Sequence, residues 1–177
     1  MHEAHQAQTN MPAVQRLSNT VTRTVTPTLD TPAAGWIGST NTAVLGDFVT
    51  IDANGRVTIA VAAGSNVGAN TTLALFAGPG SVASGTATGT TVQIEYFDNN
   101  TRIELQAVDN AGAPVATTAA MVGDSYELRN VGGIYCVDTA TTTNAKVQVV
   151  AISPRYAVGE VGGTLICKVV PAARIGG

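Results

Sequence analysis

Between residues 43 and 170, apolar and polar residues alternate in short runs that turn-forming residues separate. Alternation with a period of two places the apolar side chains on one face of a β-strand. No stretch keeps an i, i+3, i+4 apolar stripe for three turns, so we expect almost no helix. The predicted strands span residues 43–52, 56–62, 71–77, 91–97, 102–108, 124–130, 133–138, 146–152 and 164–170. Many short strands predict an all-β fold: a single β-sandwich, jelly-roll-like or barrel domain.

Two polar segments between these runs predict hairpins. Asn54-Gly55 follows the first run and supplies the positive φ that a tight hairpin turn requires. Residues 98–101 separate the runs 91–97 and 102–108, so we expect these two strands to pair with each other. Glu95 and Glu104 would then face one another on the outward, polar side of the hairpin, where we interpret them as solvated charges rather than as a catalytic pair.

The first 35 residues differ from the rest of the chain. They contain both histidines, three of the seven prolines and few large apolar residues. Pro27 follows the alternating run 21–25 and excludes that run from a central strand. We therefore expect an extended N-terminal arm, residues 1–35, and a β domain, residues 36–177. The arm is either a disordered terminus or a segment that becomes ordered against a neighbouring molecule, and both interpretations remain open.

The composition narrows the classes of partner. Charged residues make up 12% of the chain, about half of the roughly 25% that is usual, which suits a surface covered by neighbouring molecules. The net charge is −3 and the nine basic residues form no cluster, so we expect no nucleic-acid partner. No apolar run approaches the length of about 18 residues that a membrane helix needs, and the N-terminal residues do not match a signal peptide.

Residues that could carry catalysis are scarce. The only histidines, His2 and His5, lie in the arm, and a serine or cysteine nucleophile needs a histidine base within hydrogen-bond reach. Cys136 and Cys167 lie in different runs, and we interpret them as two free buried thiols, with a disulfide as the alternative. The glycine-rich segment 78–91 lacks the Gly-Lys-Ser/Thr of a nucleotide phosphate site. We expect no enzymatic activity, metal, cofactor or small-molecule substrate.

Residues 123–171 carry a family resemblance. They combine the strand pair "GDSYELRNVGGIY", a threonine-rich turn, and the corner "VVAISPRYAVG" before a last strand. This pattern resembles the C-terminal part of head decoration (capsid cement) proteins of tailed bacteriophages. On this resemblance residues 146–171 form the closing hairpin of a β shell. Pro154 and Arg155 would form its corner, and glycines at positions 159, 162 and 163 would permit the loop.

The resemblance implies a structural role. It predicts a non-enzymatic virion protein, made in the host cytoplasm, which stabilises the exterior of a capsid as a homotrimer bound between major capsid protein subunits. Such interfaces favour arginine over lysine, and the chain has seven arginines and two lysines. The loops 62–70 and 78–91 are second candidates for the interface. The first candidates lie in the arm or where it meets the β domain: Arg16, Val21, Arg23, Val25 and Trp36.

Two other functions fit an all-β chain. A tail-tube or fibre component would share the threonine- and glycine-rich composition; fibres usually show repeats, which are absent here, and a tail tube forms hexameric rings. A carbohydrate-binding or adhesin module should align two or more aromatic residues on one face. The four tyrosines lie in separate segments, at positions 96, 126, 135 and 156.

Overall fold

The structure is a computed structural model, and it describes residues 15–16, 24–25, 28–29, 42–51, 56–78, 81–83 and 90–175. The only helices among these residues are two single turns of 3₁₀ helix, η1 (Ala119–Met121) and η2 (Pro171–Ala173), so the predicted all-β fold is confirmed. The strands are β1 (Gln15–Arg16), β2 (Thr24–Val25), β3 (Thr28–Leu29), β4 (Ala43–Val44), β5 (Phe48–Ile51), β6 (Arg56–Ile59), β7 (Ala74–Gly78), β8 (Ser81–Val82), β9 (Thr90–Thr91), β10 (Gln93–Tyr96), β11 (Ile103–Val108), β12 (Ser125–Val131), β13 (Ile134–Asp138), β14 (Val147–Ile152) and β15 (Thr164–Val169).

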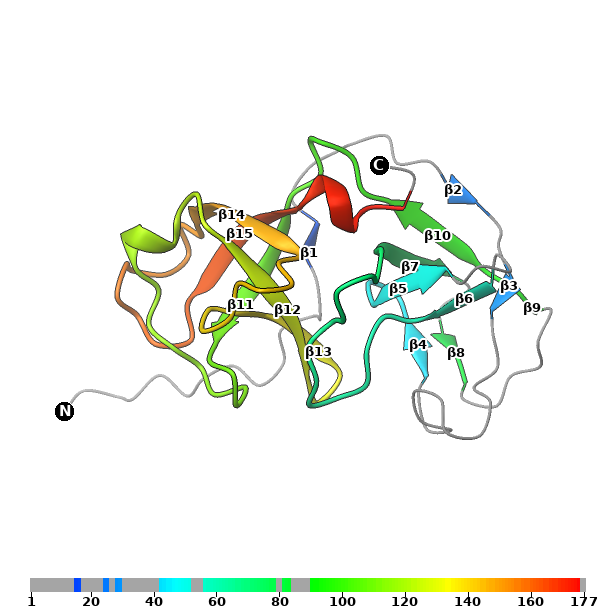
Figure 1. The fold of residues 1–177 in the computed structure, drawn as a ribbon, viewed down its shortest axis with the longest axis horizontal. Coiled ribbons are helices and arrows are strands. Elements are labelled where there is room, and N and C mark those ends of the chain that lie inside the picture. The colour runs from blue at the N-terminus through cyan, green and yellow to red at the C-terminus, as the bar shows by residue number, and fades with distance from the viewer. Residues whose placement is uncertain are drawn as a thin grey trace.

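Five strands of the C-terminal half close into a barrel (Figure 1). β11 pairs in parallel with β13 and antiparallel with β15. β12 pairs antiparallel with β13 and β14, and β14 pairs antiparallel with β15. The pairings return to the first strand, which removes the free edges that would invite aggregation. The β14–β15 pair confirms the predicted closing hairpin.

The barrel interior follows the period-two pattern of the sequence. Alternate residues of β11, such as Ile103 and Leu105, lie in one hydrophobic cluster with Leu165 and Val169 of β15. All four side chains are buried. Burial of a side chain of this size contributes about 1.5–3 kcal/mol, so the inward-facing positions supply most of the stabilisation of the barrel.

The N-terminal half forms a seven-stranded sheet in the order β2-β10-β7-β5-β6-β3-β9, with β4 and β8 paired beside it. A second hydrophobic cluster lies here and includes Val49, Val57, Phe76 and Ile94. β5 and β6 pair antiparallel, as predicted, although the Asn54-Gly55 turn between them lies outside the described residues.

The predicted hairpin between residues 91–97 and 102–108 is wrong. β10 pairs with β7 and β2, whereas β11 belongs to the barrel. The polar turn does form, because Asp98 Oδ1 accepts hydrogen bonds from the N–H groups of Asn100 and Thr101 and from the Thr101 hydroxyl. The turn leads the chain from the sheet into the barrel. The prediction was wrong because a local turn signal does not specify which strands will pair.

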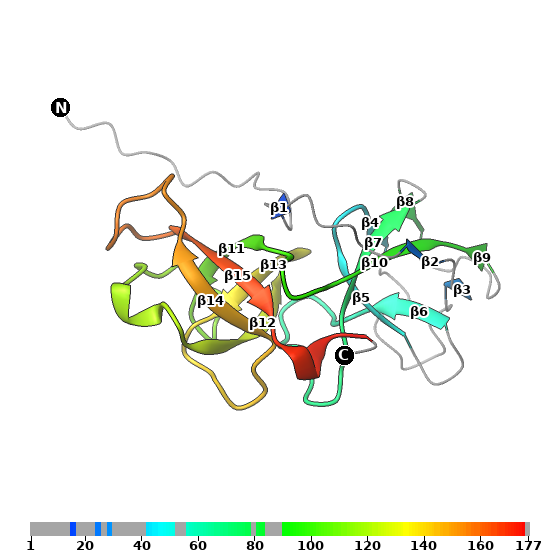
Figure 2. The ribbon, with the colours of Figure 1, turned by 90° about the horizontal axis from the view of Figure 1, so that it is seen from above.

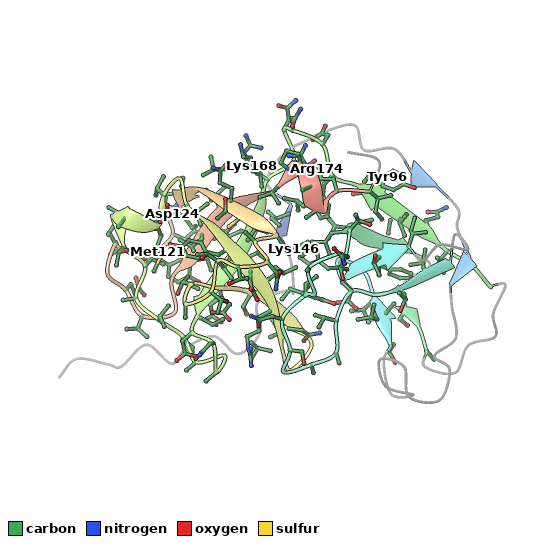
Figure 3. The ribbon with its side chains drawn as sticks, in the orientation of Figure 1. Tyr96, Met121, Asp124, Lys146, Lys168 and Arg174 are labelled. Atoms are coloured by element: carbon green, nitrogen blue, oxygen red, sulfur yellow. The ribbon has the colours of Figure 1, made fainter. Side chains whose placement is uncertain are left out.

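Aromatic rings and the C-terminal segment join the sheet to the barrel. Phe48 of β5 stacks on Phe97 at 5.5 Å between ring centroids and contacts Tyr135 of β13 at 5.0 Å. Figure 2 shows η2 where the barrel meets the sheet. Directly after η2, the buried guanidinium of Arg174 (Figure 3) donates hydrogen bonds to the Val169 carbonyl and to the Asn99 side chain. The end of the chain therefore ties the two sheets together.

The predicted boundary between arm and domain, at residues 35 and 36, lies outside the described residues. Three short segments before it are described, and each pairs with this chain's own strands: β1 with β11, β2 with β10, and β3 with β6 and β9. A search of the described residues for a helix long and apolar enough to cross a membrane found none.

Candidate interaction surface

One end of the barrel exposes apolar side chains. In the described part of the chain, the large apolar residues with substantial exposure are Val44 (43%), Leu45 (58%), Val122 (44%), Val150 (38%), Val158 (64%) and Val161 (68%). The last four lie on β14 and on the loops 109–124 and 153–163, which meet at the left end of the barrel in Figure 1. We call these four valines the valine surface.

Backbone hydrogen bonds fix the loop that carries Val158 and Val161. The N–H of Gly159 donates to the Thr117 carbonyl at 2.7 Å, and the N–H of Gly162 donates to the Val115 carbonyl at 3.0 Å. Gly159 and Gly162 have φ of +93° and +81°, which side chains rarely allow, so the predicted role of these glycines in the loop is confirmed. The two valines are therefore exposed on an ordered backbone.

The residues between η1 and β12 run beside β14 and place Val122 near the part of β14 that carries Val150. The N–H of Gly123 donates to the Val149 carbonyl, and the N–H of Val149 donates to the Asp124 carbonyl, both at 2.9 Å. Alternation along β14 buries Val149 and exposes Val150, and the register with β15 shifts between Val149 and Ala151. Met121 and Asp124 mark this end of the barrel in Figure 3.

The valine surface suits binding to another protein. Covering an exposed valine removes apolar area from water at about 25 cal/mol per Å². An ordered loop loses less conformational entropy on binding than a flexible one, so more of that energy appears as affinity.

The loop 62–70, a second candidate for the interface, is bonded to the barrel through its backbone. The N–H of Gly64 donates to the Asn130 carbonyl at 2.6 Å, and the N–H of Val67 donates to the Leu128 carbonyl at 2.8 Å. The Val67 side chain is fully buried. The loop thus pairs along an edge of β12, with Asn66 as the bridge partner of Arg129, while residues 63–65 and 68–70 remain exposed.

A buried polar cluster explains why this loop is fixed. The side-chain amide of Asn66 donates to Glu127 Oε2 at 2.6 Å and to Asp138 Oδ2 at 2.9 Å, and its oxygen accepts from Arg129 at 2.8 Å. Glu127 and Asp138 are register partners on β12 and β13, and both are buried. Because the amide occupies both carboxylates, the cluster is structural. The sequence feature that points to this cluster is the pair Glu127 and Arg129, two charged residues on the same face of β12 that require polar partners.

The expected solvated pair of carboxylates does not exist. Glu104 is 2% exposed; it accepts a hydrogen bond from the Thr164 hydroxyl and lies 3.8 Å from the Arg155 guanidinium. Glu95 is half-buried in β10, in the other sheet. The prediction that Glu104 is exposed to solvent was wrong. Alternation shows which face of β11 carries the Glu104 side chain, but it does not show whether other residues cover that face.

Other candidate chemistry is also limited. Cys136 and Cys167 are free and buried, as we expected. Burial raises the pKa of the Cys136 thiol to about 11, so the thiolate that would act as a nucleophile is disfavoured. In the residues that the structure describes, no group of three or more His, Cys, Asp or Glu side chains could hold a metal ion.

The residues predicted for the arm interface are only partly described. Arg16 and Val25 lie in β1 and β2, where the backbone of Arg16 is the register partner of Ile103 and that of Val25 the partner of Ile94. Val21, Arg23 and Trp36 lie outside the described residues. The second candidate loop, 78–91, is described at residues 78, 81–83 and 90–91, where β8 pairs with β4.

Comparison with known proteins gave no relative. No protein-family model, no curated protein and no solved structure matches the chain significantly.

Proposed function

We propose that this chain is a non-enzymatic virion protein that decorates and stabilises a bacteriophage capsid by binding between major capsid protein subunits. The observation that carries the proposal is the position of the valine surface. Val150, Val158 and Val161 lie within residues 123–171, the segment that resembles capsid decoration proteins. In this account the segment is both the closing part of the barrel and the part that binds.

Binding would combine several weak contacts. The valine surface would supply an ordered apolar contact, and the arm, with Arg16, Val21, Arg23, Val25 and Trp36, would supply a second one. A homotrimer would present three copies of each contact to neighbouring capsid subunits. Linked contacts act at a high effective concentration, so the whole attachment is much stronger than any single contact.

The alternatives receive less support. A carbohydrate-binding module needs exposed aromatic rings, but Tyr126 and Tyr135 are buried in the barrel. Tyr96 lies in the other sheet, on β10. A tail-tube component remains an all-β alternative that differs in oligomer order, as a hexameric ring.

The solution mass of the purified chain tests the proposal against these alternatives. Light scattering at micromolar concentration should give a trimer of the 17.9 kDa chain, because a closed symmetric oligomer matches a site between capsid subunits. A hexameric ring would favour the tail tube, and a monomer would favour a binding module; either result counts against the decoration role.

A further inference from the structure

Asp47 is a buried carboxyl group with little to compensate its charge. The residue is 5% exposed and lies in the turn between β4 and β5. Among the described residues, its carboxylate accepts one hydrogen bond, from the N–H of Val44 at 2.8 Å, and no cation pairs with it. An ionised carboxylate can accept about four hydrogen bonds, and the described residues supply one of them.

The turn that holds Asp47 is tied to the sheet by its backbone. The N–H of Gly46 donates to the Phe76 carbonyl at 3.0 Å, and the N–H of Phe76 donates back to the Asp47 carbonyl at 2.8 Å. The next residue, Phe48, accepts a hydrogen bond from the Tyr135 hydroxyl of the barrel. Asp47 therefore lies directly beside the junction between the sheet and the barrel.

The neighbourhood of Asp47 disfavours its charged form. Burial raises the pKa of Asp47 to about 6, and the hydrogen bond from Val44 offsets only part of that effect. The titratable group of the described chain that interacts with it is Tyr135 of β13; burial, and then the charge of Asp47, raise the pKa of this phenol. Tyr135 therefore stays neutral where Asp47 titrates, and the two groups do not exchange charge.

From this geometry we propose that Asp47 is a proton-controlled latch. The protonated carboxyl group keeps the turn between β4 and β5 closed against β7, and ionisation loosens it. The loosened turn gives water better access to the carboxylate and so hydrates the charge that burial disfavours. Val44 and Leu45, at 43% and 58% exposure, lie on the same turn, so the latch controls how two apolar side chains are presented. This inference does not depend on the proposed function.

Amide hydrogen exchange in the intact protein tests the latch. The amides of Gly46, Asp47 and Phe76 report on the closed turn, and their exchange is compared at pH 5 and pH 7.5 after correction for intrinsic rates. A carboxyl with a pKa near 6 in the closed turn and near 4 in the open turn predicts about a tenfold loss of protection over this range. Asp47→Asn should abolish the pH dependence, whereas Asp109→Asn, at an acidic turn of the barrel, should retain it.

Two results would overturn the latch: protection in the wild type that does not change with pH, or the same change in Asp47→Asn. Should Asp47→Asn fail to fold, titration of the Asp47 carboxyl carbon in the wild type by NMR gives the decision. A midpoint near pH 6 together with the loss of protection supports the latch, and a midpoint near the ordinary value of about 4 excludes it.

Discussion

The hydroxyl of Tyr135 donates a hydrogen bond to the backbone carbonyl of Phe48 across 3.0 Å, and this bond connects the barrel to the seven-stranded sheet. The two residues are 87 positions apart in the chain, and both are buried. Their rings are also in contact. The junction between the two sheets thus combines an apolar contact with a buried hydrogen bond, and the same carbonyl also accepts a bond from the Ala60 N–H at 3.0 Å.

Tyr135→Phe removes this hydrogen bond and keeps the ring. We expect the free energy of unfolding to fall by about 0.5–1.5 kcal/mol, because one buried hydrogen bond is lost while the Phe48 carbonyl keeps its bond from the Ala60 N–H. Urea unfolding followed by circular dichroism measures the change. The matched control is Tyr96→Phe at a half-buried position of β10, which we expect to change stability by less than about 0.5 kcal/mol. Equal effects of the two substitutions would argue against a stabilising role for the bond.

The stability of the wild type should depend on pH through Asp47. Its pKa of about 6 in the folded chain lies above the ordinary value of 3.8. As the pH rises from 4 to 6, the unfolded chain releases this proton while the folded chain retains it, so this group lowers the free energy of unfolding by on the order of 2 kcal/mol. Its contribution becomes constant well below the unfolded pKa of 3.8 and, once the folded carboxyl is fully ionised, above about pH 7.

The Asp47→Asn variant isolates this contribution. It should match the wild type near pH 4 and unfold at a higher urea concentration at pH 7.5, because an amide does not ionise. Unfolding curves of the two proteins at several pH values show whether ionisation of Asp47 lowers the free energy of unfolding, as predicted. A variant that loses stability relative to the wild type as the pH rises would refute the raised pKa.

Asn66→Ala should release the loop 62–70 from the barrel. The change leaves the buried carboxylates of Glu127 and Asp138 without the amide that bridges them, and we expect a loss of about 2–4 kcal/mol. Asn70→Ala, at an exposed position of the same loop, is the control and should have little effect. Chemical denaturation of the two variants compares them; similar midpoints would show that the cluster contributes no net stability.

The longer strands could be predicted from the sequence, and so could the pairs β5–β6 and β14–β15, which follow one another in the chain. The other pairings could not. Alternation placed β11 and β15 correctly because burial inside the barrel imposes a period of two on Ile103, Leu105 and Leu165. The hairpin predicted for β10 and β11 failed because Asp98 and Thr101 encode a turn and nothing more.

The contacts between the barrel and residues distant in the sequence could not be predicted either. Nothing in the segment "AAGSNVGAN" indicates that Asn66 bridges two carboxylates more than 60 positions away. Glu104 looked solvated for the same reason, since the residues that bury it are distant in sequence, as Thr164 is. Exposure of Val158 and Val161 likewise depends on loop geometry, which apolar residue type alone would not suggest.

The valine surface should contribute to capsid binding without contributing to folding. Val158→Lys together with Val161→Lys places two charges on an apolar contact, which should weaken binding to capsid shells by at least tenfold. Both side chains are more than 60% exposed, so the melting temperature should stay within a few degrees of the wild type. Pelleting with shells measures binding, and scanning calorimetry measures stability. Unchanged binding would exclude this surface as the contact.

Removal of residues 1–30 tests the arm. The truncation also removes β1, β2 and β3, which pair with the chain's own strands, so an unchanged circular dichroism spectrum must first show that the rest of the chain still folds. If the arm also contacts a neighbouring subunit, the truncated chain should then bind capsid shells more weakly, because one of the linked contacts is lost. The full-length chain with the substitutions Arg16→Ser and Arg23→Ser is the control for the loss of charge. Full binding by the truncated chain would exclude the arm from the interface.

The most direct test of the capsid role is binding to the shell itself. Purified chain is mixed with expanded shells of the major capsid protein encoded in the same genome, and with unexpanded shells, and each mixture is pelleted through a sucrose cushion. The account predicts saturable binding to the expanded shells, in a fixed ratio to capsid subunits, and shells that withstand higher temperature when decorated. A chain that stays in the supernatant at every concentration would contradict it.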